Sequence, residues 1–457
     1  MRLDSTVMHM DQFYKVDGSD RLMAHTLSNT YYYNPTGKHF VDITDVPYTG
    51  TDTNFYSSEI MNDLYIYNNG VDKIKKWNMS ASLVSDLGGA TDFRVKSRIL
   101  KYGERLNLYY TVETGYNYPQ RVRWSKLGDP EDWTAAGAGW ADLLGVMGSD
   151  FIQAAEKLGD YIIIYGERSI VLQEYKGDYN TPFGFSTRLS GVGLAAPRAI
   201  VNLGEEHIFL GWEDVYSYTG GRDVTSVGSS IRNELIASIN PAYTDKCFMV
   251  YVEERDQIFL YIPTGTATSP NVYYVYDVVD KTWSKGIRSA TSFGYYETKS
   301  SISWDEMTGS WQSHLGEIWN NRIRLANSPI TLIGDNTGHI FQDDGSVYNV
   351  DIDAIDSWWD SKDFAIQEGY RRDTVNWMEL NFEARGNVVD VYYSTDLGDS
   401  YTYLDSKTLT TDWVKYNVDF EVNAPQIRFR FRNTALSSEF RIREVEIGYL
   451  QATDRGV

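Results

Sequence analysis

This sequence has almost no cysteine, and it has neither long apolar runs nor a leader-like N-terminus. Cys247 is its only cysteine in 457 residues, so no disulfide can form within the chain. It lies in the apolar run 247–252, which predicts a small buried side chain rather than a nucleophile. No stretch approaches the roughly 18 consecutive apolar residues of a membrane span. Arg2 and Asp4 interrupt the region where a signal peptide needs an apolar core. We therefore expect a soluble protein without a membrane-spanning segment.

Basic residues are scarce relative to acidic ones. The chain has 42 Lys and Arg against 63 Asp and Glu, a formal net charge of −21. Nonspecific binding of nucleic acid depends on Lys and Arg side chains that neutralise phosphates, so we do not expect this protein to bind DNA. An acidic surface could still lie beside DNA and repel it. The hydrophobic content of 42% indicates a folded chain, and the aromatic content of 14% favours strands.

Sequence motifs of catalysis are also absent. The six histidines are scattered without metal-ligand spacing, and there is no phosphate loop, G-x-S-x-G elbow or dinucleotide fingerprint. His207 and His339 fall in predicted strands, where a hydrogen-bonded structural role is expected. Asp335, Asp343 and Asp344 could hold a calcium ion, but their spacing is not that of a calcium loop. We expect no enzyme, and no catalytic, cofactor-binding or metal-binding residues.

One pattern occurs twice, 45 residues apart (203 − 158). LGDYIIIYGERSIVLQ starts at Leu158 and LGEEHIFLGWEDVYSY starts at Leu203, without a gap. Each copy predicts an apolar strand, a four-residue turn that begins at Gly166 or Gly211, and a returning strand. Hairpins that recur every 40–50 residues are typical of β-propeller blades. The alternative is two unrelated hairpins of a sandwich. If the repeat is real, Gly166→Val and Gly211→Val should disrupt the turns.

Further hairpins extend this pattern along the chain, and we predict them at 63–77, 105–124, 257–283 and 330–341. The Asn69-Gly70 pair in the first of these is a strong hairpin signal. They suggest about six blades, with residues 300–326 as a long insertion between strands. The first fifty residues predict an extra strand or two. The predicted domains are N-terminal strands completing or leading into a propeller in 1–50, a β-propeller in 51–355 and a β-sandwich in 356–457.

The last hundred residues alternate strictly between apolar and polar positions, which predicts strands with one buried face. The alternating segments are 377–382, 388–393, 427–432 and 440–445. Short alternating strands over this length are typical of a two-sheet sandwich. The arginines among them form a ridge, which is either an ordinary solvated face or a docking surface for an acidic neighbour.

Two features of this domain bear on glycans. The segment 394–401 has the form of an Asp-box, in which Asp396 accepts backbone N–H bonds and Gly398 supplies a positive φ; we interpret it as a turn staple and not as evidence of sialidase activity. Trp358, Trp359 and Trp413 could stack on sugars, but we favour places in the sandwich core or at a domain interface.

At Arg121–Trp133, Leu158–Tyr175, 196–221 and 230–241, and again in the C-terminal VYYSTDLGDSY and IRFRFRN segments, the chain resembles a family of bacteriophage virion structural proteins. The resemblance implies a tail β-propeller with an added β domain, similar to the hub or nozzle proteins of short-tailed phages. Such proteins typically form a six-fold ring below the portal and adaptor rings, and DNA leaves through the channel without specific binding. The implied partners are further copies of the chain, adaptor-side and portal-side proteins, and distal tail proteins or fibres.

The competing hypotheses are a propeller that cleaves glycans and one that binds them. A glycan-cleaving propeller requires carboxylates, tyrosines and arginines that converge on one face. Acidic residues are so numerous here that sequence alone cannot identify such a cluster.

Overall fold

The computed structural model describes residues 2–90, 92–297, 329–343, 349–350, 353–365, 367–368, 371–372 and 375–451. These residues form antiparallel sheets, so the predicted all-β class is confirmed. The chain divides into two compact units, Met1–Asp343 and Asp344–Val457. The predicted boundary between propeller and sandwich, at 355/356, lies slightly further along the chain.

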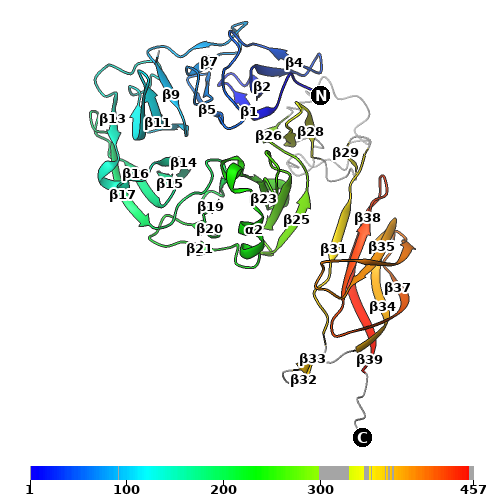
Figure 1. The fold of residues 1–457 in the computed structure, drawn as a ribbon. Coiled ribbons are helices and arrows are strands. Elements are labelled where there is room, and N and C mark those ends of the chain that lie inside the picture. Colours follow the sequence, from blue (N-terminus) through cyan, green and yellow to red (C-terminus); the bar gives the residue numbers. More distant parts are fainter. Residues whose placement is uncertain are drawn as a thin grey trace, which may run out of the picture. The chain divides into compact units, whose positions relative to one another are not determined.

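Consecutive strands make up each of the seven sheets described in the first unit, drawn from blue to olive in Figure 1. The first four sheets contain β1 (Val7–Tyr14), β2 (Asp20–Thr26), β3 (Thr30–Asn34), β4 (His39–Asp42); β5 (Ser57–Met61), β6 (Leu64–Asn68), β7 (Lys75–Trp77), β8 (Ser85–Asp86); β9 (Phe93–Val95), β10 (Ile99–Tyr102), β11 (Arg105–Glu113), β12 (Tyr116–Trp124), β13 (Gly139–Asp142); and β14 (Ile152–Leu158), β15 (Tyr161–Gly166), β16 (Ser169–Tyr175), β17 (Phe183–Ser190).

The remaining three sheets follow the same meander. They contain β18 (Ile200–Asn202), β19 (His207–Leu210), β20 (Val215–Tyr218), β21 (Thr225–Ser226); β22 (Phe248–Val252), β23 (Gln257–Ile262), β24 (Val272–Asp277), β25 (Trp283–Ile287); and β26 (Ser292–Tyr296), β27 (Ile330–Gly334), β28 (Ile340–Gln342). The helices are short: α1 (Leu144–Met147), α2 (Arg232–Ser238) and the 3-10 helices η1 (Pro241–Lys246) and η2 (Glu253–Arg255). No helix in the described part of the chain is long and apolar enough to cross a membrane.

The two ends of the first unit are joined to each other. The Val7 N–H donates to the carbonyl of Asp335 at 3.0 Å, and the Thr291 hydroxyl donates to the carbonyl of Val7 at 2.7 Å. The Leu3 N–H donates to the Gly338 carbonyl at 2.7 Å. The first sheet therefore lies beside the seventh, as Figure 1 shows.

The repeated pattern forms two equivalent hairpins. β15 pairs with β16 and β19 pairs with β20, and each hairpin supplies the second and third strands of its sheet. The other four predicted hairpins are also present as β6–β7, β11–β12, β23–β24 and β27–β28. The predicted insertion at 300–326 lies outside the described residues.

Residues 1–50 form four strands, more than the one or two predicted. The sequence signal for these strands is weak because polar residues such as His9, Asp11 and His25 interrupt the apolar pattern of β1 and β2. Residues of these strands nevertheless pack into a core, in which Phe13 and Met23 are fully buried.

Apolar clusters between neighbouring sheets explain the continuous apolar runs in the repeat. Ile162 and Ile164 of β15 pack in a cluster with the third sheet, whereas Ile163 and Tyr165 pack in a cluster with the fifth. A strand buried on both faces has no polar alternation. The run Ile162–Tyr165 is buried throughout for this reason.

The second unit contains two larger sheets with one apolar core. Their orders are β31-β38-β35-β36 and β37-β34-β39, and two small hairpins are β29–β30 and β32–β33. Phe429 and Val391 of the first sheet join Leu380 and Phe382 of the second in the core. The strands are β29 (Asn349–Val350), β30 (Asp353–Ala354), β31 (Ser357–Asp360), β32 (Gln367–Glu368), β33 (Arg371–Arg372), β34 (Val375–Gly386), β35 (Val388–Ser394), β36 (Thr402–Thr408), β37 (Val414–Ala424), β38 (Arg428–Asn433) and β39 (Phe440–Gln451).

Candidate functional site

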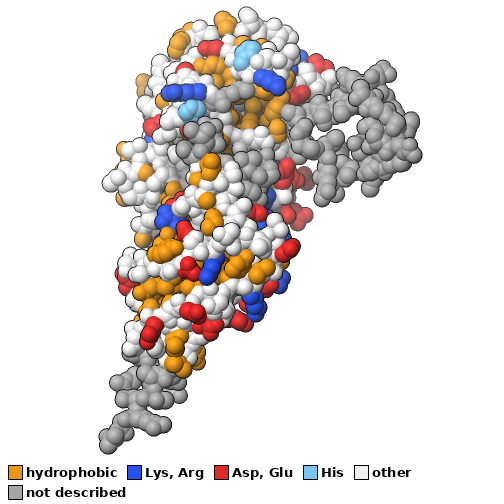
Figure 2. Space-filling view, turned by 90° about the vertical axis from the view of Figure 1, so that its right-hand side faces the viewer, with side chains coloured by type: hydrophobic (Ala, Val, Ile, Leu, Met, Phe, Trp, Pro, Cys, Tyr) orange, Lys and Arg blue, Asp and Glu red, His pale blue; other side chains and the backbone are white. Residues whose placement is uncertain are grey.

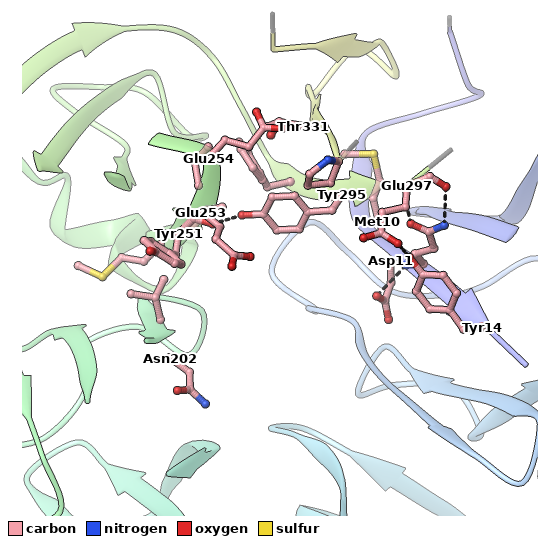
Figure 3. Close-up of a pocket in the computed structure, with 18 residues that line it drawn as sticks. Met10, Asp11, Tyr14, Asn202, Tyr251, Glu253, Glu254, Tyr295, Glu297 and Thr331 are labelled. Carbon is pink, nitrogen blue, oxygen red and sulfur yellow. Dashed lines mark hydrogen bonds between the residues drawn. The ribbon is translucent and has the colours of Figure 1, made fainter. Parts of the chain in front are cut away.

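A cavity of about 600 Å³ lies in the first unit where four sheets approach each other. Its described lining comes mainly from β1, the end of β18, β22 with η2, and β26 with the residue after it, and it contains no Lys or Arg. Figure 3 shows its polar side chains. We call it the acidic cavity, after its carboxylates and tyrosines Asp11, Tyr14, Tyr251, Glu253, Glu254, Tyr295 and Glu297.

Gln12 joins two walls of the acidic cavity. Its side-chain oxygen accepts a hydrogen bond from the Glu297 N–H at 2.7 Å, and its amide donates to the Glu297 carbonyl at 3.1 Å. The Tyr14 hydroxyl donates to the carboxylate of Glu297 at 3.1 Å. These contacts hold β1 beside the end of β26. Burial of the Tyr14 hydroxyl, and next its hydrogen bond to Glu297, raise the pKa of Tyr14.

Asp11 is held by a chain of hydrogen bonds on the other side of the cavity. Its carboxylate accepts from the Ser58 hydroxyl at 2.7 Å and from the Gln12 N–H at 2.8 Å. His9 Nε2 lies 2.9 Å from the same hydroxyl. Since the Ser58 hydroxyl donates to Asp11, it accepts from His9 and is not deprotonated by it. This order is not that of a nucleophilic triad, in which histidine removes the serine proton.

Burial shifts the acid–base behaviour of these groups. It raises the pKa of Asp11, because desolvation disfavours the carboxylate. It lowers the pKa of His9 to about 3, with Arg98 and Arg198 contributing further, so His9 is neutral at pH 7.

Tyrosines complete the wall between β22 and β26. Figure 3 shows the Tyr295 side chain extending to the backbone of Tyr251, and the Tyr295 hydroxyl donates a hydrogen bond to the Tyr251 carbonyl. The Tyr251 hydroxyl donates in turn to Asp256 at 2.8 Å. The remaining acids, Glu253 and Glu254, are exposed. Carboxylates and tyrosines in one hollow are suited to bind hydroxyl-rich molecules through hydrogen bonds.

A smaller cavity of about 130 Å³ adjoins the acidic one and shares Met249, Val250 and Phe293 with it. Its described lining includes Arg98 and Arg198 and no carboxylate. We call it the arginine cavity.

The aspartates considered for calcium have other partners. The Asp343 carboxylate lies 3.2 Å from Arg255 and 3.0 Å from Arg288, so its charge is already compensated. Asp335 caps its own turn by accepting from the N–H groups of Thr337 and His339. Asp344 lies outside the described residues. In the described ranges, no group of three His, Cys, Asp or Glu side chains is placed to hold a metal ion.

Cys247 is buried as the sequence predicts, and His207 has the hydrogen bonds expected of a structural histidine. Both are fully buried, and His207 lies 2.9 Å from the Tyr165 hydroxyl through Nδ1 and 2.9 Å from the Lys157 carbonyl through Nε2. The structural interpretation of His207 is therefore confirmed. His339 lies just before β28, beside Thr337 and Asp335 in the turn.

The Asp-box is a turn staple, as predicted. Asp396 accepts from the Ser400 N–H at 3.0 Å and from the Ser394 hydroxyl at 2.6 Å. Gly398 has a φ of +99°. The hydrogen bonds from Ser394 and Ser400 lower the pKa of Asp396, and they are local to the turn.

The three tryptophans considered for sugar stacking do not lie in the core of the second unit, unlike Trp377, which is 2% exposed and part of it. Trp358 and Trp359 on β31 are 36% and 46% exposed, so a place in the sandwich core is wrong for both, and a place at a domain interface stays a prediction. The guanidinium of Arg430 lies 5.5 Å from the centre of the Trp358 ring, and the Trp359 ring lies 5.8 Å from that of Phe431. Trp413 is half-buried, with Arg385 and Arg443 over its ring at 5.1 and 5.0 Å.

The predicted arginine ridge is present on β38, but its partners belong to the same unit. Two parallel hydrogen bonds join each arginine to an aspartate on or beside β31. The pairs are Arg428–Asp363, Arg430–Asp360 and Arg432–Asp356. On the face that Figure 2 shows, charges of both signs are likewise interspersed. The ridge therefore carries little free positive charge with which to attract an acidic neighbour.

Comparison with known proteins does not identify the chain: no family model matches it, and no curated protein matches it.

Sequence reasoning missed the residues that line the two cavities. His9 and Asp11 lie on β1, Arg98 precedes β10, and Arg198 precedes β18. They come from separate sheets, so no local spacing links them. The one available signal was the polar interruption of the apolar pattern in β1.

Proposed function

We propose that this chain is a structural component of a bacteriophage tail, a hub-type or nozzle-type ring protein located in the virion. In this proposal the first unit is a seven-bladed β-propeller and the second a β-sandwich. The main support is the junction of the first and seventh sheets by residues 3–7 with 291–338, since a closed circle of consecutive meander sheets is the definition of a propeller. The proposal has seven blades where about six were expected, because residues 1–50 supply a further four-stranded sheet.

The charge of the chain suits a conduit for DNA. Six copies in a ring carry 6 × −21 = −126 formal charges. A channel lined by part of this charge repels the phosphates, so DNA slides instead of binding. The ring extends the ejection channel and anchors the neighbouring tail proteins.

Electron microscopy of the native particle or the purified assembly tests this proposal. Symmetry is to be left free in the first reconstruction, and six-fold and other symmetries compared afterwards. A ring of propellers around a tail axis is the expected result. A protein that stays monomeric at high concentration and is absent from any particle would overturn the proposal.

The acidic cavity favours one second candidate, a propeller that binds or cleaves glycans. Asp11, Glu297 and the tyrosines converge on one hollow, with two arginines in the adjoining cavity, which is the cluster that this candidate requires. Incubation with host surface polysaccharide, followed by chromatography of the products, tests cleavage. Asp11→Asn is the diagnostic variant, and Asp390→Asn, in the other unit, is the control. Intact polysaccharide and no binding to it would exclude this candidate.

A further inference from the structure

Arg198 reaches across the interior of the first unit. Its carbonyl accepts from the Met249 N–H at 2.9 Å, which fixes its backbone beside β22. Its Nη1 donates to the Thr291 carbonyl at 2.9 Å, just before β26. The guanidinium carbon lies 4.1 Å from the centre of the Phe55 ring and 5.2 Å from that of Phe248. The guanidinium is therefore held in place by three other sheets or the loops beside them.

This positive charge has no ion-pair partner among the described residues, although the more distant Asp245 carboxylate acts on it electrostatically. Within the described ranges, no carboxylate lies at ion-pair distance from Arg198, whereas Arg98 has Glu156 at 2.5 Å. The Nε atoms of both arginines are buried without a hydrogen-bond partner. The hydroxyl of Ser292, which lines the same cavity and is 3% exposed, also has none.

Burying an unpaired charge and unsatisfied donors costs folding free energy. An apolar side chain at this position would fill the same space without that cost. Burial, with a further contribution from Arg98, lowers the pKa of Arg198 to about 10, which still leaves it charged at pH 7. The unsatisfied donors and the unpaired charge both favour the binding of an anion that is not part of the chain.

We infer that the arginine cavity binds a small oxyanion, a carboxylate or a phosphate group, with Arg198 as its principal counter-charge and Arg98 as a second donor. A guanidinium presents parallel N–H groups that match the oxygens of either anion. The volume of about 130 Å³ is on the order of four water molecules, which suits a group of a few heavy atoms. A longer ligand would extend past Met249, Val250 and Phe293 into the acidic cavity.

The test measures anion binding by isothermal titration calorimetry in a chloride-free buffer at constant ionic strength. Inorganic phosphate and acetate are the two probes, and the relative affinity tells which oxyanion the cavity prefers. We expect one saturable site per chain, with affinity at least tenfold lower in Arg198→Met. The exposed Arg222 provides the matched control, since Arg222→Met removes the same charge elsewhere. Glu156→Gln frees Arg98 and should strengthen binding.

Thermal unfolding separates a binding role from a structural one. Without anion, Arg198→Met should melt at the same temperature as the parent or higher, because a half-buried charge without an ion-pair partner is removed. Phosphate or acetate should raise the melting temperature of the parent and not that of the variant. No saturable binding of either probe, equal affinity in Arg198→Met, or a variant that only melts earlier would overturn the inference. These results do not depend on the proposed tail function.

Discussion

Among single residues, His25 shows how burial ties stability to pH. It is fully buried, with Nδ1 2.9 Å from the Thr30 hydroxyl and Nε2 3.0 Å from the Tyr65 hydroxyl. Burial, with a smaller contribution from His9, lowers its pKa well below 6.5. Below about pH 6.5 this imidazole therefore binds a proton in the unfolded chain but stays neutral in the folded one. The free energy of unfolding consequently decreases as the pH falls below 6.5.

We predict that His25→Gln lowers stability at pH 7, because it loses part of this network, but flattens the decline between pH 6.5 and pH 4. The measurement is the urea midpoint of unfolding as a function of pH. His39→Gln is the control, since His39 is exposed and should leave the slope unchanged. An equal slope in His25→Gln and the parent would show that His25 does not carry the effect.

Gly166 illustrates a glycine required by close approach. A β-carbon there would collide with the carboxylate of Asp150, which accepts from the N–H groups of Glu167 and Arg168 at 3.0 and 2.9 Å. We predict that Gly166→Ala destabilises by about 1–3 kcal/mol, and Gly166→Val by more, because the turn must shift. Gly145→Ala is the matched control, with nothing within 4 Å of its β-carbon. Urea unfolding measures both, and similar midpoints for the two alanine variants would contradict this account.

At the scale of elements, strand β38 carries a row of ion pairs that is open to a coupling measurement. Arg430 and Asp360 make two hydrogen bonds of 2.6 and 2.7 Å, and both side chains are 27% exposed. We predict a coupling free energy of about 0.5–1 kcal/mol in a double-mutant cycle of Arg430→Met and Asp360→Asn, decreasing with salt. A coupling free energy of zero at low salt would show that this ion pair does not contribute to stability.

At the scale of the whole molecule, the two units should unfold separately. Deleting residues 1–14 removes β1 and its bonds to the seventh sheet, so we predict loss of the first unit's thermal transition. The transition of the second unit should persist and match that of the isolated fragment 344–457, because each unit has its own core. Calorimetry measures both transitions. Their joint loss on deletion would show that the units fold as one.

Much of the fold was predictable because its signals are local. The twin hairpins follow from apolar runs separated by Gly166 and Gly211, and the alternation around Phe429 predicted its strand. The first sheet was underestimated, since polar residues that face cavities, such as His9 and Asp11, resemble breaks in a strand. The exposure of Trp358 was also missed, because the burial of a side chain depends on what packs over its face of the sheet, which no local pattern shows.

The sequence by itself determined the all-β class, the hairpin repeat, the change of pattern near the second unit, the excess of acid and the turn staple at Asp396. Each of these depends on residue type or on spacing within one strand or turn. Only the tertiary structure decided the junction of the first and seventh sheets, the pairing of the β38 arginines, and the meeting of Arg98 with Arg198. These depend on residues far apart in the chain, whose proximity is set by the packing of whole sheets.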